Sequence, residues 1–111
     1  MSSVWEHFFA ATAMLASTGP IKQRLAEAYR RHLADLPQEE LPKEIRDEFS
    51  ALSSCMCAVR PMRGESAVQA TVRKMSDAEA GNIAVRIVNM LGVIARQQSM
   101  QRPKLRAVGE D

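Results

Sequence analysis

Three Ser-x-x-Glu/Gln stretches constrain the fold of this chain more than any other sequence feature. They pair Ser3 with Glu6, Ser66 with Gln69, and Ser76 with Glu79. In such a capping box the serine oxygen accepts the backbone N–H three residues on, and the Glu or Gln oxygen accepts the serine N–H. Two donors that every helix start leaves open are paired in this way. Each stretch therefore predicts a helix start.

Together with two prolines, the boxes divide the chain into four main helices and one short helix. We expect main helices over residues 4–16, 20–36, 42–59 and 76–97, and a short helix over residues 66–75. Pro20 and Pro42 suit the first turn of a helix, and Pro37 ends the second helix before it. Val68, Ala70 and Val72 also alternate as a strand would, so a strand stays open for the short segment.

The fourth main helix is apolar around most of its circumference. Its main face holds Ile83, Ala84, Ile87, Met90, Leu91 and Ile94, and Val85, Val88 and Val93 extend the apolar surface. A helix of this kind is central in its bundle or buried against a second subunit. We therefore predict an all-α fold, a small helical bundle with the fourth helix central, and a homodimer in which the three valines are candidates for self-association.

Length and charge place limits on the class of protein. The 111 residues make one domain, which we assign to residues 1–98, with a flexible tail over residues 99–111. Apolar residues are 46% and the net charge is +2, which indicates a folded body and makes a nucleic-acid partner unlikely from charge alone.

A cytoplasmic protein without membrane association is the expected location. No signal peptide is evident, and the apolar region 83–95 is too short for a bilayer and contains Arg86 and Asn89. Two cysteines in a single Cys-Met-Cys run cannot form a disulfide framework, so reduced thiols are expected.

The histidines and cysteines are the candidates for chemistry. His32 lies on the apolar arc of the second helix, where burial favours the neutral imidazole that a general base or metal ligand requires. A core histidine with a hydrogen-bond partner explains the same position, and His7 is interpreted as solvated. Cys55 and Cys57 offer sulfur ligands for copper(I) or zinc, with Met62 and Met75 as further candidates. The two thiols diverge around a helix, however, and a zinc site normally shows two separated pairs of ligands. No metal or other cofactor is predicted.

Four basic residues precede the two later helix starts. Arg60 and Arg63 lie before Ser66, and Arg73 and Lys74 lie before Ser76. Helix N-termini and guanidinium groups attract phosphate and carboxylate groups, so these residues are candidates for binding an anion or a partner. A solvated loop paired with acidic residues explains them as well.

Charge and aromatic distribution suggest how the helices pair. Packing of the second helix against the third should place Arg30 and Arg31 near Glu39, Glu40 and Glu44. The aromatic cluster of the first helix, Trp5, Phe8 and Phe9, is expected to fill the core, with anchoring of a partner protein as the alternative.

The absence of a catalytic motif predicts a non-enzyme that works through protein–protein interaction, as a regulator or adaptor that self-associates. The partner surface is expected on the loop 60–65, on the short helix after it, and on any uncovered part of the fourth helix. Two alternatives stay open: nucleic-acid or anion binding through Arg60, Arg63, Arg73 and Lys74, and an enzyme or ligand carrier built around His32.

Overall fold

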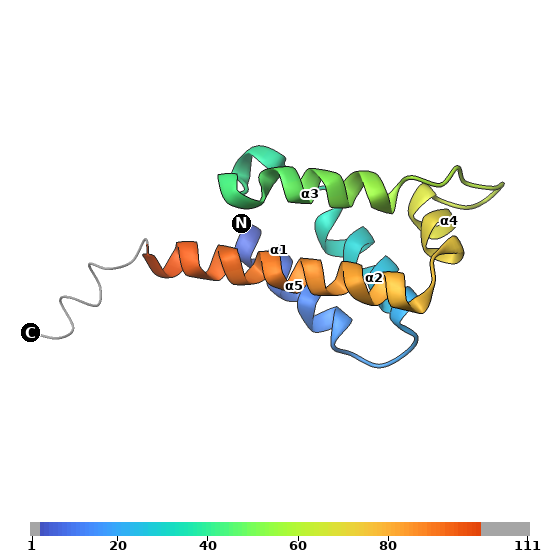
Figure 1. Cartoon of the computed structure of the whole chain (residues 1–111), viewed down its shortest axis with the longest axis horizontal. Coiled ribbons are helices and arrows are strands. Elements are labelled where there is room, and N and C mark those ends of the chain that lie inside the picture. The colour runs from blue at the N-terminus through green and yellow to red at the C-terminus, as the bar shows by residue number, and fades with distance from the viewer. Residues whose placement is uncertain (1–2, 101–111) are drawn as a thin grey trace, which may run out of the picture.

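The computed structural model describes residues 3–100 and is helical throughout, with no strand among those residues (Figure 1). The five α-helices are α1 (Val4–Leu15), α2 (Ile21–Ala28), α3 (Lys43–Met56), α4 (Ala67–Lys74) and α5 (Asp77–Met100). A π-helical segment, η1 (Tyr29–Leu33), continues α2, and a 3₁₀ turn, η2 (Gln38–Glu40), precedes α3. The all-α prediction is confirmed, and the strand alternative for residues 68–72 is wrong.

All three capping boxes form. Ser3 Oγ accepts the Glu6 N–H at 3.2 Å, Ser66 Oγ accepts the Gln69 N–H at 3.1 Å, and Ser76 Oγ accepts the Glu79 N–H at 3.0 Å. The returning side chains accept the three serine N–H groups at 3.2, 2.9 and 2.8 Å. Because each box is closed within four residues, the helix starts follow from local chemistry alone.

The second helix departs from the expected continuous α-helix. After Ala28 the chain widens into η1, in which the Ala34 N–H donates to the Tyr29 carbonyl at 2.8 Å, five residues back. His7 Nδ1, on α1, lies 3.0 Å from the His32 carbonyl oxygen in this segment. A π-turn of this kind depends on contacts between helices, so apolar periodicity cannot predict it.

One hydrophobic cluster joins the helices. α1 packs against α2 and α5, α4 packs against α2 and α3, and α3 also packs against α5. Phe8 and Phe49 meet edge to face with ring centroids 5.8 Å apart, and both are fully buried. Burial of a large apolar side chain contributes about 1.5–3 kcal/mol. Phe8 therefore has the core role expected of it, whereas Phe9 is 52% exposed.

The charged residues of the second helix pair locally rather than with the third helix. Arg30 Nη2 and Arg31 Nε lie 2.8 and 2.9 Å from the carboxylate of Glu27, one turn before them. No ion pair joins either arginine to Glu39, Glu40 or Glu44 within residues 3–100. The predicted pairing is wrong because a partner one turn away is available without any tertiary contact.

The third and last helices end elsewhere than expected. α3 stops at Met56, three residues before the predicted end, and α5 continues to Met100. Ser99, assigned to the flexible tail, is therefore helical. The remainder of that tail lies outside the described residues.

Candidate interaction surface

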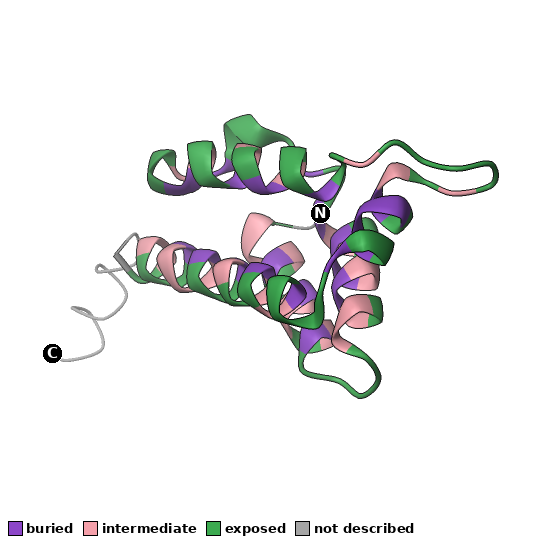
Figure 2. Cartoon of the chain, turned by 45° about the vertical axis from the view of Figure 1, so that its right-hand side comes forward, coloured by how far each residue is buried: buried purple, intermediate pink, exposed green. Residues whose placement is uncertain are grey.

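α5 exposes apolar side chains on the side that faces away from the core. Buried, intermediate and exposed residues alternate along α5 (Figure 2). Val85 is 58% exposed and Val88 is 43% exposed, although both lie in the middle of a 24-residue helix. Val93 is partly buried and packs against the core. It follows Val88 by five residues, or about 140° around the helix axis. The structure thus brings together two of the three predicted self-association residues and separates the third from them.

α1 adds to the same surface. Phe9 stacks on Trp5 with ring centroids 5.0 Å apart and an interplanar angle of 13°. Thr12 and Ala16 of α1 line a groove of about 290 Å³ together with Leu15 and, from α5, Ala84, Val85 and Val88. At 100° per residue, Phe9, Thr12 and Ala16 fall within 60° of one another on α1.

We call this surface the α1–α5 face. It consists of Thr12 on α1, the C-cap residue Ala16, and Ala84, Val85 and Val88 on α5, together with Phe9, which helical periodicity places on the same side of α1 as Thr12. Among the residues that the structure describes, the exposed large hydrophobic side chains are Phe9, Met62, Val85 and Val88. Three of these four belong to the α1–α5 face, so exposed apolar area is concentrated rather than scattered.

α5 is also long and apolar enough, by length and composition, to cross a membrane. Within Asp77–Ser99, the most apolar window of 18 residues has a mean hydropathy of 1.3, and 33% of that window is buried inside the protein. This apolar stretch is longer than the region 83–95 that was predicted to be too short for a bilayer. Core helices of water-soluble proteins share this length and composition.

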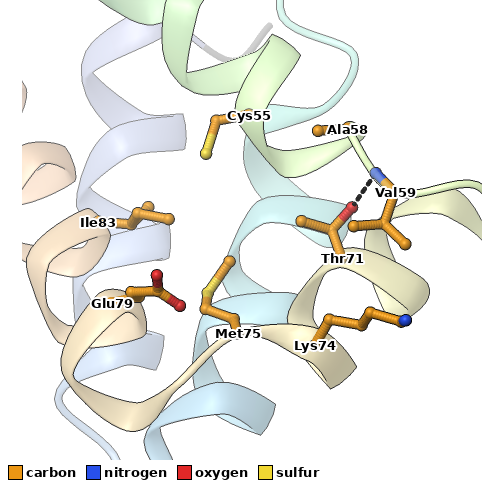
Figure 3. Close-up of a pocket in the computed structure, with 8 residues that line it drawn as sticks. All are labelled: Cys55, Ala58, Val59, Thr71, Lys74, Met75, Glu79 and Ile83. Carbon is orange, nitrogen blue, oxygen red and sulfur yellow. Dashed lines mark hydrogen bonds between the residues drawn. The ribbon is translucent and has the colours of Figure 1, made fainter.

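A second hollow lies where the end of α3 meets α4 and the start of α5. This cavity of about 360 Å³ is lined by Cys55, Ala58, Val59, Thr71, Lys74, Met75, Glu79 and Ile83 (Figure 3). The Val59 N–H donates to Thr71 Oγ1 at 3.0 Å and closes one wall. Thr71 is only 6% exposed. The lining is mainly apolar, and the cavity has the volume of a small-molecule pocket. No histidine is among the lining residues, so the Cys55 thiol has no base there to activate it as a nucleophile.

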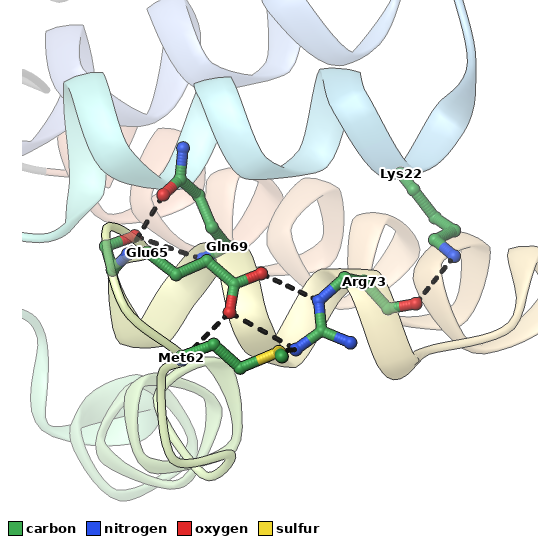
Figure 4. A network of polar contacts seen from close by, with 6 residues as sticks. Lys22, Met62, Glu65, Gln69 and Arg73 are labelled. Atoms are coloured by element: carbon green, nitrogen blue, oxygen red, sulfur yellow. Dashed lines mark hydrogen bonds and ion pairs between the residues drawn. The ribbon is translucent and has the colours of Figure 1, made fainter.

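The loop between α3 and α4 is held by a clamp of polar contacts (Figure 4). Arg73 Nε donates to Glu65 Oε2 at 2.7 Å, and Arg73 Nη2 donates to Glu65 Oε1 at 3.2 Å. The same Oε1 accepts the Met62 N–H at 3.1 Å. The hydrogen bond from Arg73 lowers the pKa of Glu65, and the carboxylate in turn raises the pKa of Arg73.

The four predicted anion-binding residues therefore have different surroundings. Arg73 is engaged by Glu65, and Lys74 lines the cavity beside Cys55. Arg60 and Arg63 are exposed on the loop. Glu65, eight residues before Arg73, was not predicted as its partner. Their opposite charges on either side of Ser66 were the available signal for the clamp.

The histidines do not form a catalytic pocket within the described residues. His32 is half-buried in η1, rather than buried in the core, and it lines neither the groove nor the cavity described above. His7 is half-buried and hydrogen-bonded to the His32 carbonyl, so its interpretation as a solvated residue is wrong.

The sulfur run has a mixed environment. Met56 is fully buried between Cys55 and Cys57, which are both exposed free thiols. Over residues 3–100, no group of three or more His, Cys, Asp or Glu side chains is arranged to hold a metal ion.

Comparisons with known proteins identify no family or function for this chain. No protein-family model, no curated protein and no solved structure matches the chain.

Proposed function

We propose that this protein is a non-catalytic, cytoplasmic helical-bundle protein that works through protein–protein interaction as a regulator or adaptor, and that it self-associates through the α1–α5 face. The observation that carries the proposal is the exposure of Val85 and Val88 in the middle of α5. In the dimer α5 is central, because one side packs within its own chain and the other against the second copy.

The size of the face is compatible with a stable contact. Removing one large apolar side chain from water contributes about 1.5–3 kcal/mol, and association costs at least about 4 kcal/mol in lost freedom of motion. Phe9, Val85 and Val88 from each of two copies supply six such side chains. Rows of small residues around them allow close packing.

A second copy is a better cover for this face than a lipid bilayer. The opposite side of α5 buries Ile83, Ile87, Met90 and Ile94 in the core of the chain. Side chains of α5 also join α3: Arg86 Nε lies 3.5 Å from Glu48 Oε2, and Gln97 Nε2 donates to Glu44 Oε2 at 2.8 Å. Crossing a membrane would remove α5 from all of these contacts.

The two alternatives have less support. Anion or nucleic-acid binding loses Arg73 to the clamp with Glu65, which leaves Arg60 and Arg63 as exposed charges on a loop. Within residues 3–100, His32 lines neither the groove of the α1–α5 face nor the cavity beside Thr71, so neither hollow supports a site around it.

Sedimentation velocity at about 50 µM tests the proposal. The unmodified chain is expected to sediment as a dimer and Val88→Lys as a monomer with unchanged helix content. Met62→Lys is the matched control, because Met62 is 62% exposed on a loop remote in sequence from the face, and it is expected to remain dimeric. A monomeric unmodified chain, or equal loss of the dimer in both variants, contradicts the proposal.

A further inference from the structure

The exposed side of α5 carries a repeat that its own chain leaves unused. Starting at residue 78, alanine, glycine, valine and serine follow one another at alternating spacings of three and four: Ala78, Gly81, Val85, Val88, Gly92, Ala95 and Ser99. None of them is buried. Alternation of three and four places residues on one stripe of a helix, which is the spacing of a coiled-coil seam. We call these seven residues the α5 seam.

Six of the seven residues of the α5 seam, all except Ser99, are symmetric about the point between Arg86 and Ile87. Moving outward from that point, residues at equal distance in the two directions match: Val85 with Val88, Gly81 with Gly92, and Ala78 with Ala95. One position further out the pair is Asp77 with Arg96, which have opposite charge. A stripe of residues that reads the same in both directions can pack against an antiparallel copy of itself.

On the basis of the proposed self-association, we infer that the α5 helices of two copies pack antiparallel along the α5 seam, about a twofold axis between Arg86 and Ile87. Each Val85 then faces Val88 of the other copy, and the four valines form the centre of the contact. Layers of glycine and then of alanine follow on both sides. In an antiparallel coiled coil, the two alternating seam positions face each other in this way.

Charge favours the antiparallel direction. Asp77 of one copy lies opposite Arg96 of the other, and the twofold axis produces this pair twice. A parallel arrangement would place Asp77 beside Asp77 and Arg96 beside Arg96, which is repulsive. Asn82 and Asn89, both exposed, flank the seam and supply the polar rim that such contacts have.

The two glycines give independent support for a closely approaching helix. A Cβ added at Gly81 would meet nothing within 4 Å, and one at Gly92 would meet only Arg96 Nη1 at 4.0 Å. Neither has the positive φ that requires glycine, since Gly19 and Gly64 are the glycines with positive φ in the described region. Glycine in a helix interior is destabilising relative to alanine. Packing within the chain thus gives no reason for either residue, whereas a second helix at an axis distance of about 8 Å does.

Cysteine cross-linking tests the direction and the register. In a background with Cys55→Ser and Cys57→Ser, which removes two exposed thiols, we compare Ala78→Cys alone, Ala95→Cys alone, and an equal mixture of the two. Under mild oxidation the mixture is expected to give a mixed disulfide at least about tenfold faster than either variant forms its own. Disulfides need Cα atoms within about 7 Å, and in the antiparallel dimer each of these residues lies about 25 Å along the helix axis from its own copy. Sedimentation of the same samples before oxidation reports whether a dimer is present.

The outcomes separate this inference from the proposed function. Rapid cross-linking of each variant with itself means a parallel dimer, and a dimer without any cross-link means a contact elsewhere. Either result overturns the inference and leaves self-association intact. Absence of a dimer in the Cys55→Ser, Cys57→Ser background itself overturns both.

A charge exchange provides a second readout of the register. Asp77→Arg and Arg96→Asp are each expected to weaken dimerisation about two- to fivefold, and the double variant is expected to restore most of it. Both residues lie near the ends of α5, so each single variant keeps the valine layers. A double variant that binds no better than the weaker single variant means that the two side chains do not face each other, and contradicts the register.

Discussion

The residues along the exposed side of α5 are smaller than those on its buried side. The inward side buries large side chains, namely Ile83, Ile87, Met90 and Ile94. The exposed side carries alanine, glycine and valine at regular spacing. Large branched residues fill the irregular space between three helices of one chain, whereas small residues suit close approach of a single second helix. Residue size therefore separates the intrachain core from the proposed contact.

Truncation of the two sides should give the largest difference. Ile87→Ala is expected to lower the free energy of unfolding by about 2–5 kcal/mol, because Ile87 is fully buried and its removal leaves a cavity. Val85→Ala in the same single chain should change it by less than about 0.5 kcal/mol. Urea unfolding in a Val88→Lys background, which keeps the chain monomeric, measures both. Equal losses would show that the exposed side is part of the intrachain core.

Removal of the capping box at the start of α5 should have an intermediate effect on the free energy of unfolding. Ser76→Ala removes the acceptor for the Glu79 N–H and should destabilise the fold by about 1 kcal/mol. Ser54→Ala, at an exposed site near the end of α3, is the matched control and should have little effect. Urea unfolding of both variants, again in the monomeric background, compares them. If the two changes cost the same, the Ser76 capping box contributes nothing of its own.

Gly81→Ala should have opposite signs in the monomer and in the dimer. In the monomeric background it should stabilise the fold by up to about 1 kcal/mol, because alanine forms helices better than glycine and its Cβ meets nothing within 4 Å. In the unmodified chain it should weaken dimerisation, because the methyl group enters the glycine layer. Unfolding and sedimentation measure the two effects. Stabilisation in both settings would contradict a close contact at Gly81.

The smallest expected effect is a pH-dependent change in the loop between α3 and α4. The pKa of Glu65 is lowered below its ordinary 4.5, first by the hydrogen bond from Arg73, so the folded loop prefers the carboxylate. The clamp is then complete above pH 4.5 and is lost as pH falls through the lower value in the folded protein. The amide NMR signal of Gly64 should shift over that interval without change at α5. Arg73→Gln should abolish this transition, and an unaltered transition would exclude the clamp as its cause.

The sequence predicted the structure well where a feature depends only on residues close together in the chain. The capping boxes required four residues each, and all three helix starts formed as expected. The π-helical segment, the contact between His7 and the His32 carbonyl, and the cavity beside Thr71 all depend on which helices meet, so no periodicity encodes them.

The same physical reason explains the separation of the three valines. Apolar residues surround most of α5, and only the positions of α1, α2 and α3 decide that Val93 packs inward while Val85 and Val88 stay exposed. For Arg30 and Arg31, in contrast, the local sequence decides the pairing. Both pair with Glu27, one turn away, and not with the distant acidic residues that the charge distribution predicted.

The concentration dependence of unfolding tests most directly whether a second copy covers the exposed side of α5. Urea unfolding of the unmodified chain is compared at two protein concentrations a hundredfold apart, with Val88→Lys measured in parallel. A dimer gains about 2.7 kcal/mol from that change, so the midpoint should rise with concentration in the unmodified chain and stay constant in the variant. A midpoint that is identical at both concentrations in the unmodified chain would contradict the account.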